Sequence, residues 1–279
     1  MPVRIVTDSS ADLPADDVER LGLEVVPLSI RFGDEEYTDG VDLSVAQFYE
    51  KLASSADLPE TAAPAPGAFE AAFRRQAEAG ADAVVCINLS SGLSATIQSA
   101  QNAAKAVADD LDVRVVDSRS ITAGLGTQVR AAAEAAAGGA GADEVVALVE
   151  GMVGRTHVIG ALDTLDNLKK GGRIGGAQAL LGSLLSIKPL LDISSGEVEE
   201  AGRARTRRRA LDWLRDRIFA LPEVEELTVA HGMAPDVDHM VALLAPRYPA
   251  DKLRVTTIGP TIGTHGGPRV MGLSWIDPA

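Results

Sequence analysis

The first half of the chain alternates short, continuously apolar runs with segments of helical pattern, and this alternation constrains the fold more than any other feature. The apolar runs are VRIV at 3–6, LEVVPLSI at 23–30, AGADAVVCINL at 79–89 and VRVVDS at 113–118. The helical patterns lie around Ala15–Leu21 and at 68–80, 94–111, Thr122–Ala137 and 142–153. Strands without polar alternation, separated by helices, are typical of a parallel sheet covered by helices on both faces. We therefore predict an α/β protein.

The second half has a different pattern, in which strands and helices do not alternate regularly. Strands are expected at 157–163, 223–232, 253–259 and 270–276, and a helix at 236–248. The stretch 166–176 is rich in turn residues, and an apolar helix is expected to run into a strand within 179–193. We predict two α/β domains: residues 1–150 with a mainly parallel sheet, and residues 151–279 with a mixed sheet.

Polar clusters follow three of the predicted parallel strands. They are TDSS at 7–10, NLSSGLS at 88–94 and VDSRS at 116–120. Ligands of open parallel sheets bind beyond the carboxyl ends of the strands, so we expect these clusters to face one crevice. Asp8, Ser9 and Ser10 are also expected to cap the helix around Ala15–Leu21.

The segment NLSSGLSAT, residues 88–96, leaves a predicted strand and enters a predicted helix. It places hydroxyls and free backbone N–H groups at a helix N-terminus, where an anion is stabilised. The simpler alternative is an N-cap by Ser91 or Ser94, which contributes about 1 kcal/mol. Three serines within five residues, with Gly92 between them, exceed what one cap requires and favour an anion site.

His265 lies in the glycine-rich segment GPTIGTHGGPRVMG, residues 259–272. Glycines allow the backbone to bend sharply and to approach a ligand closely. Ser94 and His265, with Asp8 or Asp117, could form a serine hydrolase site, although the G-x-S-x-G pattern is absent around Ser94. Such sites are recognised by geometry rather than by sequence order, so an acyl hydrolase stays an alternative.

Composition excludes several classes of partner. Residues 1–154 hold 10 Lys/Arg and 25 Asp/Glu, whereas residues 155–279 hold 16 and 15. The acidic first half repels nucleic acid and anionic membranes, and only five Phe, three Tyr and two Trp are available for base stacking. No apolar run approaches the ~20 residues of a membrane span, and the N-terminus is too quickly polar for a secretory signal. We expect a cytoplasmic protein without a nucleic-acid partner.

Metal and cofactor sites have little support in the sequence. Cys86 lies in an apolar run and is predicted to be a buried strand residue rather than a catalytic thiol. The four histidines lack H-x-x-x-H spacing, no P-loop motif is present, and GLGTQV at 124–129 holds only two glycines of a dinucleotide fingerprint. We therefore predict no metal and no cofactor.

Two segments concentrate positive charge. LDNLKKGGRIGG, residues 165–176, fits an ordinary helix end with a glycine cap, but Arg173 could also reach a carboxylate or phosphate. RARTRRR, residues 203–209, is either a solvated face paired with Glu197, Glu199 and Glu200 across a hairpin, or a docking site for an acidic partner or phosphate. A pure interaction module for a phosphorylated partner is a further hypothesis.

Eight motifs occur together and in a fixed order. They are TDSSADLP at 7–14, TAAPAP at 61–66, SSGLSAT at 90–96, VDS at 116–118, LKKGGRI at 168–174, IKP at 187–189, RTRRRA at 205–210 and IGTHGGP at 262–268. In this combination the chain resembles the DegV family of bacterial fatty-acid-binding proteins over nearly its whole length.

The resemblance implies a non-enzymatic, two-domain α/β protein that holds one fatty acid between its domains, with the acyl tail in an apolar tunnel. The family residues that bind the carboxylate correspond to Thr61, Ser94 and His265. Some members present the acid to the separate catalytic subunit of a fatty acid kinase, which makes acyl phosphate. Arg173 and Arg205 match basic positions that could contact that partner or the phosphate.

The sequence departs from the family pattern at two places beside the expected carboxylate. Ala62 and Ala63 replace the polar residues of the family segment T-S-Q-P. Ala95 replaces a glycine, so a methyl group stands where the backbone is expected to meet the carboxylate. Helical dihedrals at Ala95 would tolerate that methyl group.

Overall fold

The computed structural model describes residues 2–180 and 187–278, which form three sheets and the helices that cover them. The first sheet is parallel and has the order β2–β1–β6–β7. Its strands are β1 (Val3–Asp8), β2 (Glu24–Val26), β6 (Ala83–Asn88) and β7 (Asp112–Asp117). The predicted parallel sheet is therefore confirmed.

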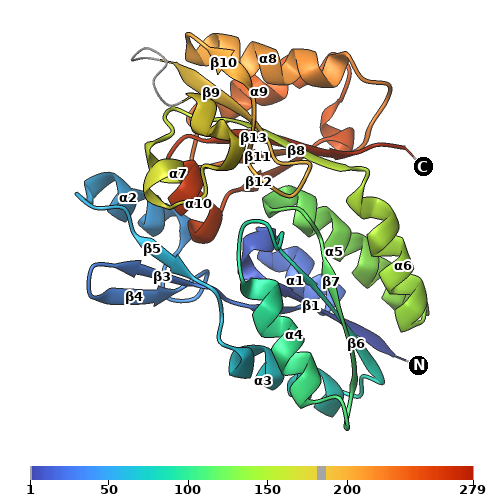
Figure 1. Ribbon diagram of the computed structural model, residues 1–279. Helices are drawn as coiled ribbons and strands as arrows, with labels where there is room; N and C mark the ends of the chain where they lie inside the picture. The colour runs from blue at the N-terminus through green and yellow to red at the C-terminus, as the bar shows by residue number, and fades with distance from the viewer. Residues whose placement is uncertain (1, 181–186, 279) are drawn as a thin grey trace.

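Helices cover both faces of the parallel sheet (Figure 1). One face packs against α3 (Pro66–Glu78) and α4 (Thr96–Ala106). The other packs against α1 (Ala15–Leu21), α5 (Thr122–Ala137) and α6 (Ala142–Val153). All six residues of β6 are buried, as expected for a strand covered on both sides, and Cys86 is one of them.

The second sheet is mixed and has the order β10–β9–β8–β13–β11–β12. Its strands are β8 (Thr156–Ala161), β9 (Lys188–Asp192), β10 (Glu199–Ala204), β11 (Glu225–His231), β12 (Arg254–Thr257) and β13 (Met271–Ile276). Only the β11–β12 pair is parallel, which confirms the predicted mixed sheet. Its outer face packs against α8 (Arg207–Phe219) and α9 (Val237–Leu244).

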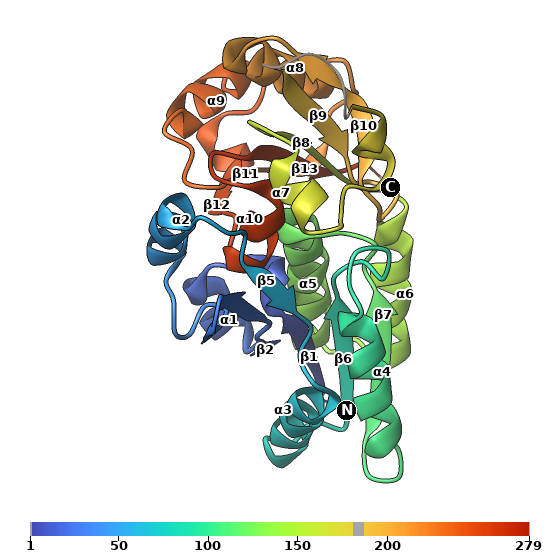
Figure 2. The ribbon, with the colours of Figure 1, turned by 60° about the vertical axis from the view of Figure 1, so that its left-hand side comes forward.

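Helix α5 lies between the two large sheets (Figures 1 and 2). Eleven of its sixteen residues are buried, so it is covered on almost every side. Two glycines allow this close packing. A Cβ atom on Gly124 would lie 2.6 Å from Val158 Cγ2 of the mixed sheet, and one on Gly126 would lie 2.7 Å from the Ala11 carbonyl oxygen.

The prediction of one strand over residues 23–30 is wrong. Pro27 has no N–H group to donate, and the run breaks there into β2 and β3 (Ser29–Phe32), which belong to different sheets. Strand β3 pairs antiparallel with β4 (Glu35–Thr38) and β5 (Glu60–Ala62) in a third sheet that the sequence did not suggest. Helix α2 (Val45–Ser54) lies between β4 and β5 in the chain.

Helix ends also differ from expectation. Helix α1 has the predicted range, but its N-cap is Pro14; Asp8 instead caps the short 3-10 helix η1 (Ser9–Ala11). Helix α9 is shorter than the predicted 236–248. The apolar helix expected within 179–193 falls largely on residues 181–186, which lie outside the described residues.

Across residues 2–180 and 187–278, no helix combines the length and apolar character that a membrane span requires. The division into domains near residue 150 stays a prediction, although the parallel sheet ends before it and the mixed sheet begins after it.

Substitution of Gly126 tests the close packing of α5. Gly126→Ala should lower the free energy of unfolding by about 1–3 kcal/mol, because the new methyl group meets a backbone oxygen. Gly151→Ala is the matched control: Gly151 is also a helical glycine, but a Cβ atom there meets nothing within 4 Å. The control should be stabilised by about 0.5–1 kcal/mol. Urea unfolding of both variants measures the difference, and equal effects would contradict the packing described.

Candidate functional site

A cavity of about 210 Å³ lies between the parallel sheet and the mixed sheet. Its wall is largely apolar and comes from both halves of the chain. The side chains from the first half include Leu28, Leu89, Leu93 and Ile121, and those from the second half include Val158, Leu162, Leu168, Leu191, Ile193, Ile258, Ile262 and Val270. Such a cavity suits an apolar ligand, provided that any polar end of the ligand finds hydrogen-bond partners.

The cavity brings together all but one of the residues that the sequence predicted for a ligand or its phosphate. Thr61, Ser94, Ala95, Arg173 and His265 all line it. Arg205 does not line the cavity; it is an exposed residue directly after β10.

Thr61 and His265 form a hydrogen bond although they stand 204 positions apart in the chain. The distance between Thr61 Oγ1 and His265 Nε2 is 3.0 Å. Thr61 lies in β5, where it pairs with Ile30 of β3, and His265 lies in the last turn of α10 (Pro260–Gly266). The small third sheet therefore carries one half of this polar pair, and the C-terminal part of the chain carries the other.

The His265 ring is held in its neutral form at neutral pH. Burial lowers its pKa to about 4, and the positive charge of Arg173 acts in the same direction. The ring packs against Gly171, where a Cβ atom would lie 2.4 Å from His265 Nδ1. His265 Nδ1 is buried and has no hydrogen-bond partner among the described residues. Nε2 is the nitrogen that faces Thr61.

Ser94 and Ala95 stand at the N-terminus of α4, as the sequence predicted. Ser94 Oγ lies 2.9 Å from Thr96 Oγ1 and accepts the Thr96 N–H at 3.3 Å. The helix begins at Thr96 with Ala95 as its N-cap, so the simpler alternative of an N-cap by Ser91 or Ser94 is wrong. Ala95 has φ −79° and ψ 6°, which any L-residue adopts, so its methyl group fits without backbone strain.

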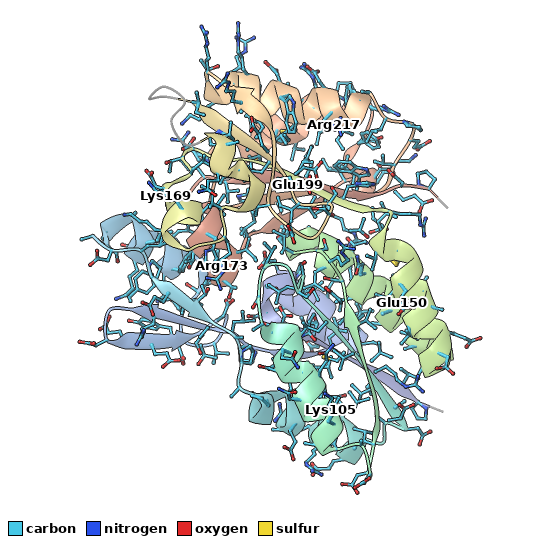
Figure 3. All side chains as sticks on the ribbon, in the orientation of Figure 1. Lys105, Glu150, Lys169, Arg173, Glu199 and Arg217 are labelled. Carbon is cyan, nitrogen blue, oxygen red and sulfur yellow. The ribbon has the colours of Figure 1, made fainter. Side chains whose placement is uncertain are left out.

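Arg173 follows α7 (Asp166–Lys170), which ends at the predicted glycine cap, Gly171. Its guanidinium group donates to the Gly171 carbonyl at 2.8 Å, and its Nε donates to the Leu93 carbonyl at 3.4 Å. Figure 3 shows Arg173 near α7 and α10, at the level between the two large sheets. The arrangement places a positive charge beside the polar end of the cavity.

Two buried carboxylates hold the start of α10, and the sequence analysis did not identify their role. Asp12 Oδ1 accepts the Gly259 N–H at 2.9 Å. Asp39 Oδ2 accepts from Thr261 Oγ1 at 2.5 Å and from Ser9 Oγ at 2.9 Å. Burial raises the pKa of both acids, and their mutual repulsion raises that of Asp12 further. These bonds fix the helix that carries His265.

The glycines around His265 serve two purposes, close packing at Gly263 and a backbone turn at Gly267. Half of the segment, Pro260–Gly266, forms α10, so the residues around His265 are helical. A Cβ atom on Gly263 would lie 2.5 Å from the Tyr49 hydroxyl, and Tyr49 donates to the Ile258 carbonyl at 3.1 Å. Gly267 ends the helix with φ 78°, in the region that favours glycine.

The three polar clusters of the parallel sheet do meet at its carboxyl edge. Asp8 Oδ2 accepts from the Leu89 N–H at 2.9 Å, and the Ser90 N–H donates to the Ser120 carbonyl at the same distance. Asp8 also accepts from Ser10 and Asn88. The Asp8 carboxylate therefore joins the loop after β1 to the loop after β6, and the bond between Ser90 and Ser120 joins the loop after β6 to the loop after β7.

The arginine cluster 203–209 is arranged differently from the predicted hairpin of paired charges. Arg207 forms a two-pronged ion pair with Asp236, at 2.9 and 3.0 Å. Among the ion pairs of the described residues, none joins the cluster to Glu197, Glu199 or Glu200, so the alternative of paired charges across a hairpin is wrong. Glu199 and Glu200 lie in β10, the strand that also holds Arg203. Four arginines of the cluster are exposed: Arg203, Arg205, Arg208 and Arg209.

The geometry of Ser94 and His265 differs from that of a hydrolase. Ser94 Oγ pairs with Thr96, whereas His265 Nε2 pairs with Thr61. The second ring nitrogen, which a carboxylate orients in a catalytic triad, has no partner in the part of the chain that the structure describes. Within the same residues, no group of three or more His, Cys, Asp or Glu side chains could hold a metal ion.

Comparison with known proteins decides the family. Residues 2–277 match the family described as uncharacterised proteins of the DegV family. The chain belongs to the DegV family. A DegV domain-containing protein of Streptomyces coelicolor is 40% identical over 278 residues, which cover 97% of each chain. One from Listeria innocua is 34% identical over 277 residues, which cover 98% of each chain.

Solved structures of DegV proteins share the whole fold. The structure of a fatty-acid-binding DegV family protein from Thermus thermophilus has a TM-score of 0.90 at 33% identity and covers all of both chains. DegV of Bacillus subtilis, described as a fatty acid binding protein, has a TM-score of 0.88 at 29% identity, again over all of both chains.

The lowered pKa of His265 predicts a pH dependence of stability in the ligand-free protein. Because its pKa is about 4 when folded and 6.5 otherwise, the folded state binds fewer protons between these values. The contribution of the neutral His265 ring to the free energy of unfolding is fully present above pH 6.5. It is lost as the pH falls toward 4, and the total loss is about 2–3 kcal/mol.

The measurement compares urea unfolding of the wild type and His265→Gln between pH 4 and 7. The raised pKa values of Asp8, Asp12 and Asp39 change the free energy of unfolding with the opposite sign. Because they do so in both proteins, the difference between the two pH profiles isolates the effect of His265. Parallel profiles for the wild type and His265→Gln would mean that the ring is not held neutral by burial.

Proposed function

We propose that this DegV protein binds one long-chain fatty acid, with the acyl chain in the cavity between the two large sheets and the carboxylate at Thr61, Ser94 and His265. The observation that carries the proposal is the position of these three side chains at one apolar cavity. The fatty-acid-binding DegV proteins of the same fold support it. We further propose that the protein acts in the cytoplasm and has no catalytic role of its own.

The energy of such a complex comes from the acyl chain. A chain of sixteen carbons has ~14 methylene groups, and burial of each contributes about 0.8 kcal/mol, or roughly 11 kcal/mol before the loss of motional freedom is subtracted. The carboxylate must keep hydrogen bonds, because a buried charge without partners would cost several kcal/mol. Two hydroxyls, an imidazole N–H and the N-terminus of α4 would supply them.

We expect the carboxylate to bind at the position of the hydrogen bond between Thr61 and His265. In the structure the two groups satisfy each other. A carboxylate oxygen could accept from both Thr61 Oγ1 and His265 Nε2, so one bond would be exchanged for two. The bound negative charge would raise the pKa of His265, and Arg173 would add a long-range attraction.

Presentation to a fatty acid kinase is the second part of the proposal. Arg173 stands beside the proposed carboxylate, and the exposed arginines around Arg205 supply positive charge that an acidic partner or a transferred phosphate could meet. A hydrolase that uses Ser94 and His265 is the alternative. It would require the imidazole to leave Thr61 and to reach Ser94.

The first test is the ligand itself. The purified protein should release long-chain fatty acids on extraction, as detected by mass spectrometry, and the delipidated protein should bind palmitate. His265→Ala should weaken palmitate binding by about tenfold, because a charge-assisted hydrogen bond is lost. His239→Ala, at an exposed histidine away from the cavity, should bind like the wild type. A protein that neither carries nor takes up fatty acid would refute the proposal.

The second test concerns the kinase partner. Arg205→Ala should bind palmitate normally but support less acyl phosphate formation with a fatty acid kinase catalytic subunit and ATP. The defect should fade as salt rises, since exposed charges more than about 8–10 Å apart are screened at physiological ionic strength. Arg217→Ala, at an exposed arginine near the other end of α8, is the control (Figure 3). Equal rates for wild type and Arg205→Ala at low salt would remove Arg205 from the partner site.

A further inference from the structure

Two buried hydroxyl groups face the apolar cavity without a partner. Ser274 Oγ and Thr122 Oγ1 have no hydrogen-bond partner among the described residues. Both side chains line the cavity, and the residues are only 1% and 3% exposed. A buried hydroxyl without a partner is unfavourable, so each such group in an otherwise apolar wall requires an explanation.

Ser274 stands on the face of β13 that looks into the cavity. Its neighbours in the strand, Leu273 and Trp275, pack on the opposite face with α8 and α9. Ser274 pairs with Val158 of β8, and Gly272 pairs with Gly160. Gly160, Gly272 and Ser274 all line the cavity, so the residues along this part of its wall are small. An alanine would open the same space; the serine adds a hydroxyl group.

Thr122 approaches the same wall from the first turn of α5. Gly124, two residues later, packs against Val158, the register partner of Ser274. Thr122 has φ 44°, a left-handed conformation that is strained for a β-branched residue. Burial raises the pKa of the nearby Asp12 carboxyl group, and the Thr122 hydroxyl opposes this rise. The two groups do not reach hydrogen-bond geometry, so Thr122 Oγ1 and Asp12 Oδ2 have no partner within the described residues.

These hydroxyls lie on other elements than the proposed carboxylate site. Thr61, Ser94 and His265 come from β5, the start of α4 and α10, whereas Thr122 and Ser274 come from α5 and β13. A ligand with its carboxylate at the first site would pass the second with its acyl chain. An unsubstituted chain would leave both hydroxyls without a partner, whereas an oxygen atom on the chain would pair with them.

We propose that Ser274 and Thr122 form a second polar subsite within the cavity, which recognises a hydroxyl or keto oxygen on the acyl chain. The ligand class is thereby an oxygenated long-chain fatty acid. This inference rests on the proposed binding of fatty acids and deepens it. The two hydroxyl groups without partners would discriminate between oxygenated and unsubstituted fatty acids. A site that hydrogen-bonds an oxygen atom of its ligand binds an analogue without that atom less tightly.

The test compares stearate with a series of monohydroxystearates whose hydroxyl group is moved along the chain. The wild type should bind at least one isomer as tightly as stearate or more tightly. Ser274→Ala should weaken the binding of that isomer by about tenfold, which corresponds to the loss of one hydrogen bond in a buried site. The same variant should bind stearate as tightly as the wild type does, or more tightly. Binding is measured by calorimetry on delipidated protein.

Ser120→Ala is the matched control. Ser120 Oγ is likewise buried without a partner among the described residues, but Ser120 does not line the cavity. This variant should keep the wild-type ratio between the hydroxylated acid and stearate. If every hydroxystearate binds more weakly than stearate, and Ser274→Ala leaves each ratio unchanged, the subsite does not exist. Failure to bind stearate at all would instead refute the proposed function.

Discussion

The carboxylates of Asp12 and Asp39 connect the two ends of the chain, and the site depends on this connection. Both accept hydrogen bonds from the segment that begins α10, at Gly259 and Thr261. The helix then places His265 within hydrogen-bond distance of Thr61, which lies in β5 of the third sheet. The acids are buried with raised pKa values, so their hydrogen bonds must offset a cost of desolvation. Loss of one acid would therefore release one of the hydrogen bonds that hold the helix of His265.

Small residues determine where the molecule is closely packed and where it is hollow. Gly124, Gly126 and Gly263 bring backbone against neighbouring elements at distances that no side chain would permit. Gly160 and Gly272 line the cavity, where no side chain of their own projects from them. The interior thus combines tight contacts around α5 and α10 with an apolar hollow between the sheets. A ligand that fills this hollow would restore the dispersion contacts that its wall lacks.

Much of the fold could be predicted because the strands of the parallel sheet are continuous apolar runs, such as Ala83–Asn88. The third sheet could not, because its strands have three or four residues and β3 is joined to β2 by only Pro27 and Leu28. Thr61, Ser94 and His265 were identified through motifs, and the structure brings them to one cavity. Asp12 and Asp39 were missed as positioning residues, because their partners lie more than 200 positions away and no local spacing indicates such bonds.

A crystal structure of the protein with bound palmitate tests the central claim most directly. We predict one carboxylate oxygen within hydrogen-bond distance of both Thr61 Oγ1 and His265 Nε2, the other near Ser94, and the acyl chain between the parallel and mixed sheets. The direct bond between Thr61 and His265, now 3.0 Å, should be lengthened or replaced. A carboxylate located away from these three residues, or palmitate bound outside the cavity with the Thr61–His265 bond intact, would contradict the account.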